Sequence, residues 1–394
     1  MKVLHTSDWH AGKLWKGRSR LDELAAVLDD LGHVIERDRI DLVLMTGDIF
    51  DTPSPSAEAE RLVFGFFRRV GRLGVPSVVI AGNHDSATRV EAWGQLAELA
   101  HVTTSGVPKV AAHGGCAAIE TRSGRAIVAM VPFAPVARLI SAQQLGEAPE
   151  RAPGRYAAEM RRLVARTCEG FRPDAVNLLL AHTHVEGARL GGTERRVHVT
   201  DDWAASVDTF PATAQYVALG HVHLHQSLDD AMAPAWYAGS PMQLDFGEEG
   251  HAKAYNVVDV RPGQPARIEP RPYVGARPLR TLTVSPESLR VAPAHVADQP
   301  HVRVVVEVAG GPVPADINRR VRAAIPGVVS VDVRRTGSDL TEREHLAPRA
   351  DGTLDPRGLY AHYHEIRHGS APSSAVLRAF DELLDAVHAV EVTT

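Results

Sequence analysis

The stretch GDIFD, residues 47–51, directly follows the apolar run LVLM at residues 42–45. An apolar run of this length predicts a buried strand. The turn behind it places the carboxylate of Asp48 at the carboxyl end of that strand, which is the end that faces the ligand in layered α/β sheets. Asp48 is therefore the first candidate for a functional residue.

Polar side chains that can bind a metal follow other apolar runs in the same way. Apolar residues at helical spacing separate the first three runs, over residues 21–35 and 56–73, so the order is strand, helix, strand, helix, strand. This order predicts a layered α/β sheet with its functional residues at the carboxyl ends of the strands. The polar residues at these predicted ends are Asp8, His10, Asp48, Asn83, His84, His182, His221 and His223.

The rest of the chain divides into further parts. Strands expected near 125–131, 175–181, 215–219 and 255–260, with a helix near 156–169, extend the first domain over residues 1–260. Five prolines between residues 261 and 278 predict a connector, since proline interrupts helices and central strands. Residues 279–337 predict a small α/β domain, with an extension of the first sheet as the alternative. Residues 338–394 predict a helical segment, with helices near 359–367 and 374–390.

Composition and charge narrow the class of protein. The 394-residue chain is 44% hydrophobic and has a formal net charge of −5, which argues against binding nucleic acid through bulk positive charge alone. A polyanion must then be held locally, by metal ions or clustered arginines. Two cysteines and no long apolar segment predict a cytoplasmic protein without a membrane span.

The polar residues at the strand ends have the chemistry of a metal site. Imidazole, carboxylate and amide groups together suit Mn, Fe or Zn, and the absence of cysteine argues against a structural zinc site. Two divalent ions about 3.5–4 Å apart need a shared ligand, so we expect Asp48 to bridge them. Asp8 and His10, two residues apart in an extended segment, can reach one ion. His221 and His223 either share an ion or bind one each.

The ordered motifs SDWH at 7–10, GDIFD at 47–51, GNHD at 82–85, His182 and GHVH at 220–223 resemble the calcineurin-like metallophosphoesterase superfamily. Within it, YVALGHVH at 216–223 and YAGSP at 237–241 are similar to the SbcD family, the nuclease subunits of bacterial SbcCD complexes. The resemblance is specific over residues 1–260 and looser beyond them. It implies a layered β-sandwich flanked by helices, with a small capping domain and a C-terminal helical segment behind it.

The resemblance also assigns roles to the motif residues. It implies that the first metal ion is held by Asp8, His10, Asp48 and His223, and the second by Asp48, Asn83, His182 and His221. His184 is the alternative to His182 as a ligand. His84 takes a proton-donating role at the transition state.

Four further residues are expected to support the site. Asp51 and Asp85 are interpreted as orienting the ligands, because metal-bound histidines commonly donate their other nitrogen proton to a carboxylate. Arg18 and Arg20 follow the first metal loop and are candidate DNA contacts.

The implied activity is that of a DNA phosphodiesterase using two divalent ions, Mn by expectation, with Fe, Zn or Mg as alternatives. It implies a 3′-5′ exonuclease on double-stranded ends and an endonuclease on single strands and hairpins. The implied partners are DNA and an SbcC-type coiled-coil ATPase bound by the C-terminal helices, with a homodimer inside a heterotetramer at the nucleoid. The alternative function is a small-molecule phosphoesterase or cyclic-nucleotide phosphodiesterase on the same scaffold.

Overall fold

The structure, a computed structural model, describes residues 1–141, 151–192, 194, 203–291, 300–309, 313–325, 327–336, 355–368 and 370–391. It contains two compact units. The first comprises Met1–Thr281 together with Pro300–Arg303, and the second contains the other described residues from Leu282 onward. Arg18 and Ser19 form β3 (Arg18–Ser19), which pairs with β2 (Leu14–Trp15) in a small hairpin of the first unit.

The first six-stranded sheet carries the amino-terminal half of the candidate site. Its central strands run parallel, and the last two strands along the chain add to one edge in antiparallel fashion. In spatial order the strands are β14 (Gln264–Pro272), β13 (Ala254–Arg261), β1 (Lys2–Thr6), β4 (Leu42–Met45), β5 (Ser77–Ile80) and β6 (Val102–Ser105).

A second six-stranded sheet carries the other half. Four of its strands are parallel, and an antiparallel strand closes each edge. In spatial order the strands are β11 (Gln226–Ser227), β12 (Ala235–Tyr237), β10 (Tyr216–Gly220), β9 (Val176–His182), β8 (Gly124–Val131) and β7 (Cys116–Thr121).

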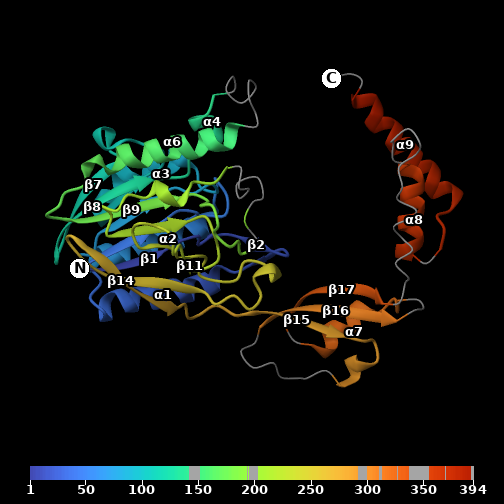
Figure 1. The fold of residues 1–394 in the computed structure, drawn as a ribbon. Helices are drawn as coiled ribbons and strands as arrows, with labels where there is room; N and C mark the ends of the chain where they lie inside the picture. Colours follow the sequence, from blue (N-terminus) through green and yellow to red (C-terminus); the bar gives the residue numbers. More distant parts are fainter. Residues whose placement is uncertain are drawn as a thin grey trace. The chain divides into compact units, whose positions relative to one another are not determined.

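The two sheets pack face to face and helices cover their outer faces. Alternation along β4 shows the layers: Leu42 and Leu44 belong to the core between the sheets, while Val43 and Met45 pack under the helices. Figure 1 shows α1 outside the first sheet and α6 outside the second. The helices of this unit are α1 (Leu21–Arg37), α2 (Ala57–Arg72), α3 (Ala87–Ala97), α4 (Val136–Leu139) and α6 (Ala152–Thr167).

Most of the predicted elements of the first unit are confirmed. At the start of α2, the Ser56 hydroxyl accepts the Ala59 amide proton at 3.3 Å and caps the helix. The connector predicted over residues 261–278 is wrong for Gln264–Pro272, which form β14. Among the described strands, β14 pairs only with β13, and it lies at the sheet edge. Prolines are tolerated there because an edge strand leaves one row of its backbone groups unpaired.

A third sheet is formed mainly by residues of the second unit. Strands β15 (Leu279–Val284), β16 (His301–Ala309) and β17 (Val328–Thr336) pair in that order, and α7 (Ile317–Ala324) packs on β17. These elements lie within residues 279–337, for which the sequence predicts a small α/β domain, and their sheet is distinct from the two six-stranded sheets. The two C-terminal helices, α8 (Pro356–His368) and α9 (Ser374–Glu391), follow. Among the described residues no helix is long and apolar enough to cross a bilayer.

A buried ion-pair network ties the start of α1 to the end of the first unit. Glu23, 8% exposed, accepts hydrogen bonds from Arg20 at 2.8 Å, from His301 at 2.6 Å and from the Arg277 amide at 2.9 Å. Arg20 also donates to the backbone oxygen of Gln243. Burial raises the pKa of Glu23, but the hydrogen bonds from His301 and Arg20 outweigh it and hold that pKa well below its ordinary value.

We therefore predict that Glu23→Gln lowers the free energy of unfolding at neutral pH by about 3 kcal/mol, because it leaves Arg20 buried without its charge partner. A carboxylate whose pKa is depressed in the folded state stabilises fully above its unfolded pKa, roughly 4.3, and progressively less below it. Urea unfolding of both proteins from neutral pH down to roughly pH 3 tests this. A stability difference that stays constant over this range contradicts the assignment.

Candidate metal centre

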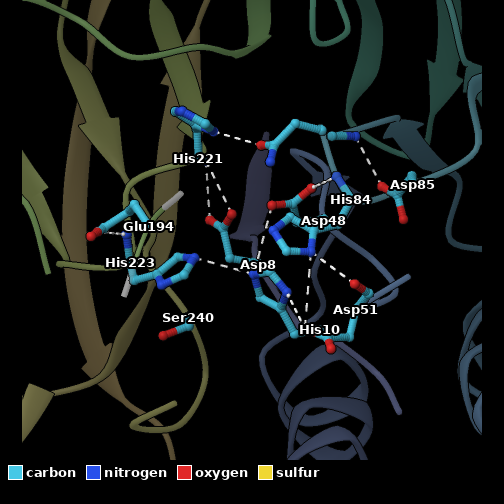
Figure 2. A network of polar contacts seen from close by, with 12 residues as sticks. Asp8, His10, Asp48, Asp51, His84, Asp85, Glu194, His221, His223 and Ser240 are labelled. Carbon is cyan, nitrogen blue, oxygen red and sulfur yellow. Dashed lines mark hydrogen bonds and ion pairs between the residues drawn. The ribbon is translucent and has the colours of Figure 1, made fainter. Parts of the chain in front are cut away.

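The candidate residues lie where the carboxyl ends of the parallel strands of both sheets meet. Asp8 and His10 follow β1, Asp48 follows β4, and Asn83 and His84 follow β5. From the second sheet, His182 ends β9, and His221 and His223 follow β10. The His221 amide donates to Asp8 at 3.1 Å and so joins the loops of the two sheets. Figure 2 shows His221 and His223 on one side of the site, Asp48 and His84 on the other, and Asp8 between them.

The loops that carry these residues have unusual backbone conformations. Non-glycine residues rarely adopt positive φ angles, and such strain collects at functional sites. Asp8 has φ 51°, His10 45°, Asp48 49° and His221 98°. Gly82 has a different constraint, because a Cβ there would lie 2.1 Å from Oδ1 of Asp48. The loops therefore pack too closely for any side chain at position 82.

A first group of ligand atoms consists of Asp8, His10, Asp48 and His223, each with one atom within 4.8 Å of the others. Nε2 of His10 lies 3.1 Å from Nε2 of His223 and 3.6 Å from Oδ2 of Asp48. Atoms bound to one ion at about 2.1 Å lie about 3 Å from each other. The spacing therefore fits ligands of a single ion.

A second group of ligand atoms shares Asp48 with the first and adds His182 and His221. Oδ1 of Asp48 lies 3.6 Å from Nε2 of His182, whereas its Oδ2 faces the first group. Oδ1 of Asn83 lies 3.0 Å from His182 and 2.7 Å from His221. His184 belongs to neither group among the described residues. The two oxygens of Asp48 thus point to two adjacent groups.

The hydrogen bonds of the histidine rings show which ring nitrogens carry protons, and the unprotonated nitrogens face one another. Nδ1 of His10 lies 3.2 Å from a carboxylate oxygen of Asp51, and Nδ1 of His223 lies 3.2 Å from one of Glu248. Because carboxylates only accept, both Nδ1 atoms carry protons and both Nε2 atoms are unprotonated in neutral imidazoles. In the second group, Nδ1 of His182 donates to the carbonyl oxygen of Thr46 at 2.7 Å. Such converging lone pairs fit cations between them.

The electrostatics of the site lead to the same conclusion. Burial raises the pKa of Asp8 to about 8, and the charge of Asp48 adds to that effect. Burial also lowers the pKa of His10 to about 4. For His223, burial lowers the pKa, but the hydrogen bond to Glu248 and the charge of Asp8 raise it above its ordinary value. Buried carboxylates repel each other here, and divalent cations relieve that repulsion.

Asp51 and Asp85 support the site in two different ways. Asp51 accepts from His10 and from Lys13, at 3.2 and 3.1 Å, so its carboxylate holds the His10 ring. Asp85 contacts backbone amides instead, accepting from Ile49, Phe50 and Gly82 at 2.9–3.2 Å. It therefore holds the turn of Asp48 against the turn of Asn83, a role that the expectation of a histidine partner does not describe.

His84 is held next to the first group by its backbone and its ring. Its amide donates to Oδ1 of Asp48 at 2.8 Å, and its Nδ1 donates to the carbonyl oxygen of Asp51 at 2.8 Å. The ring packs edge-on against His10, with 4.6 Å between centroids. These contacts fix the ring of His84 beside the first group.

The sequence patterns do not identify three residues of the site, and they assign Arg20 a role that its position contradicts. Glu248 and Glu194 contact His223, and Phe133 stacks on His221 at 5.9 Å between centroids. The two glutamates do not follow a predicted strand, and Phe133, which follows β8, is not polar. Arg18 is exposed, as a DNA contact requires. Arg20 is 6% exposed and its guanidinium is bonded within the protein, so it is not presented to DNA.

Comparison with known proteins identifies the family of this chain. Residues 1–225 match the calcineurin-like phosphoesterase family. The chain is 33% identical over 395 residues to the SbcCD nuclease protein SbcD of Rhodobacter capsulatus, and the match covers 92% of this chain and 94% of that protein. It belongs to the SbcD family of calcineurin-like phosphoesterases.

Other members of the SbcD family match over shorter lengths. The SbcD protein of Bacillus subtilis is 34% identical over 282 residues, covering 71% of each chain. The SbcD protein of Escherichia coli is 28% identical over 336 residues, covering 82% of each. The likeness thus extends beyond the phosphoesterase domain into the second unit of the chain.

The packing at Gly82 yields a prediction. We expect Gly82→Ala to weaken binding of divalent metal by at least about 10-fold, as changes next to ligands commonly do, because the new Cβ displaces Asp48. Gly65→Ala is the matched control, since a Cβ at Gly65 in α2 meets nothing within 4 Å and alanine favours a helix. Mn titration followed by electron paramagnetic resonance measures both. Equal affinities for the two variants contradict this account of the site.

Proposed function

We propose that the protein is a metal-dependent DNA phosphodiesterase, the nuclease subunit of an SbcCD-type DNA repair complex. One observation carries the proposal: two groups of converging ligand atoms share Asp48 in a chain of the SbcD family. The relatives are named as nuclease subunits, and this chain brings together two groups of residues that could hold metal ions. The proposed reactions are 3′-5′ exonuclease action on double-stranded ends and endonuclease action on single strands and hairpins.

We assign the first ion to Asp8, His10, Asp48 and His223, and the second to Asp48, Asn83, His182 and His221. The grouping of their atoms supports the assignment and supports His182 over His184. Mixed nitrogen and oxygen ligands suit Mn, with Fe, Zn or Mg as alternatives. When bound, a pair of divalent ions supplies an activated water and neutralises charge on the phosphate.

His84 is the proposed proton donor. Its Nδ1 is committed to the carbonyl oxygen of Asp51, so its Nε2 is the nitrogen that faces the leaving oxygen in this proposal. A protonated imidazole donates a proton to that oxygen as the P–O bond breaks. General acid catalysis of this kind typically raises the reaction rate about 10²–10⁴-fold. The hydrogen bond from the His84 backbone amide to Asp48 holds this ring in place beside the proposed ligands.

Local cations compensate for the net negative charge of the chain. Arg18 is exposed on the hairpin that follows the first metal loop. Lys13, in the same segment, is paired with Asp51 at 3.1 Å beside His10. We propose that Arg18 contacts the DNA backbone, because an arginine fork matches phosphate geometry.

The C-terminal helices are the proposed contact with the SbcC-type ATPase. Tyr360 of α8 stacks on Phe380 of α9, with 4.3 Å between centroids and 8° between planes, so the two helices pack on each other. Leu383 remains 68% exposed on α9 and Tyr363 50% exposed on α8. Apolar side chains on helices suit docking to another helix. The proposed assembly is a homodimer of this chain inside a heterotetramer.

The nuclease proposal predicts that Asp48→Asn lowers the rate of Mn-dependent hydrolysis of blunt-ended and hairpin DNA by at least about 10³-fold. The reason is that both ligand groups lose their shared carboxylate. Asp259→Asn, on an exposed position of β13, is the matched control and keeps wild-type activity. Gel analysis of labelled DNA measures both.

The same assay distinguishes a nuclease from the alternative, a small-molecule phosphoesterase. A small-molecule phosphoesterase hydrolyses a chromogenic phosphodiester rapidly and is not inhibited by DNA. Full DNA cleavage by the Asp48→Asn protein, or turnover of small esters alone by the wild type, contradicts the nuclease proposal.

A further inference from the structure

A buried glutamate lies behind one of the proposed ligands. Glu248, the last residue of the turn η8 (Phe246–Glu248), is 0% exposed. Its Oε1 lies 3.2 Å from Nδ1 of His223, and its Oε2 accepts from the Leu244 amide at 3.0 Å and from Nζ of Lys253 at 2.6 Å. Each carboxylate oxygen thus has a different task, one facing the histidine and one facing the lysine.

Lys253 and Glu194 hold the backbone of the same histidine. Nζ of Lys253 donates to the carbonyl oxygen of His223 at 3.0 Å and to the hydroxyl of Ser240 at 2.8 Å. The His223 amide donates to Oε1 of Glu194 at 2.9 Å, a contact drawn in Figure 2. The ring, the amide and the carbonyl of His223 are therefore each fixed by a charged group.

We propose that Glu248 is the positioning residue of His223: it holds the proton on Nδ1 and aims Nε2 into the first metal site. This inference rests on the proposed function, which makes His223 a metal ligand. A carboxylate behind a metal-bound histidine fixes both the tautomer and the ring orientation, and its loss typically costs about 10–100-fold in metal affinity. Lys253 makes the arrangement possible, because an unpaired carboxylate this deeply buried is very costly.

The two histidines that face each other in the first group are supported unequally. His10 donates to Asp51, whose side chain is 21% exposed and is shared with Lys13. His223 donates to Glu248, whose side chain is 0% exposed. Solvent can replace part of the support of His10, whereas His223 and Glu248 are both buried away from it. The His223 side of the first ion is therefore the more sensitive to loss of its carboxylate.

The turn that carries Glu248 is itself anchored. Oε1 of Glu249 accepts from the Thr281 amide at 2.9 Å, and Oε1 of Gln243 accepts from the Leu279 amide at 2.7 Å. The start of β15 therefore fixes the segment that fixes His223. Glu249→Gln keeps the accepting oxygen and removes one charge, which makes it a matched control for Glu248.

The test measures Mn stoichiometry and affinity by electron paramagnetic resonance for wild type, Glu248→Leu, the double variant Glu248→Leu/Lys253→Met, and Glu249→Gln. We expect Glu248→Leu and the double variant to bind one of two ions about 10–100-fold more weakly, with the other ion and Glu249→Gln unchanged. Thermal unfolding without metal checks that each variant is folded. If Glu248→Leu does not fold, the double variant, in which the lysine is removed together with its partner, provides the result.

The outcomes separate the two proposals. Wild-type affinity for both ions in the folded double variant shows that Glu248 only neutralises Lys253, and overturns the inference. Equal weakening of both ions also overturns it, because the inference assigns Glu248 to a ligand of only one. A wild-type protein that binds fewer than two Mn ions instead refutes the proposed metal centre itself.

Discussion

The convergence of histidine lone pairs and buried carboxylates at one edge of two sheets is the constraint on which the site depends. Two Nε2 atoms lie 3.1 Å apart, each with its proton on the other nitrogen. The carboxylates of Asp8 and Asp48 lie in the same cluster with almost no contact with water. Without cations this arrangement is repulsive, so the fold must hold it in place by other interactions.

Those interactions are in the loops and in the residues behind them. Left-handed backbone at Asp8, His10, Asp48 and His221 turns each side chain toward the centre. Asp85 ties the turns of Asp48 and Asn83 together through three amides. Glycine at position 82 permits the close approach that this requires. The strain is offset by the packed cores on both faces of the two sheets.

Much of the fold and of the candidate ligand set can be predicted from the sequence, because each parallel strand shows a regular pattern of apolar residues. Each central strand is an apolar run and each candidate ligand lies at the end of one, so Asp48 and His182 stand out without coordinates. The candidate ligands also come from few segments, and short motifs such as GNHD keep neighbouring residues together.

The remaining features depend on contacts between distant segments. Glu248 lies 25 residues from His223 in a turn with no periodic pattern, so only the folded chain brings them together. Arg20 looks like a surface arginine until Glu23 and the backbone of Gln243 are seen to surround it.

The central claim is that two adjacent cation sites share Asp48. A crystal structure of the protein soaked in Mn²⁺, with anomalous difference maps, tests it most directly. The account predicts two peaks about 3.5–4 Å apart, one between His10 and His223 and one between His182 and His221, each in contact with one oxygen of Asp48. A single peak, or peaks that do not contact Asp48, would contradict it.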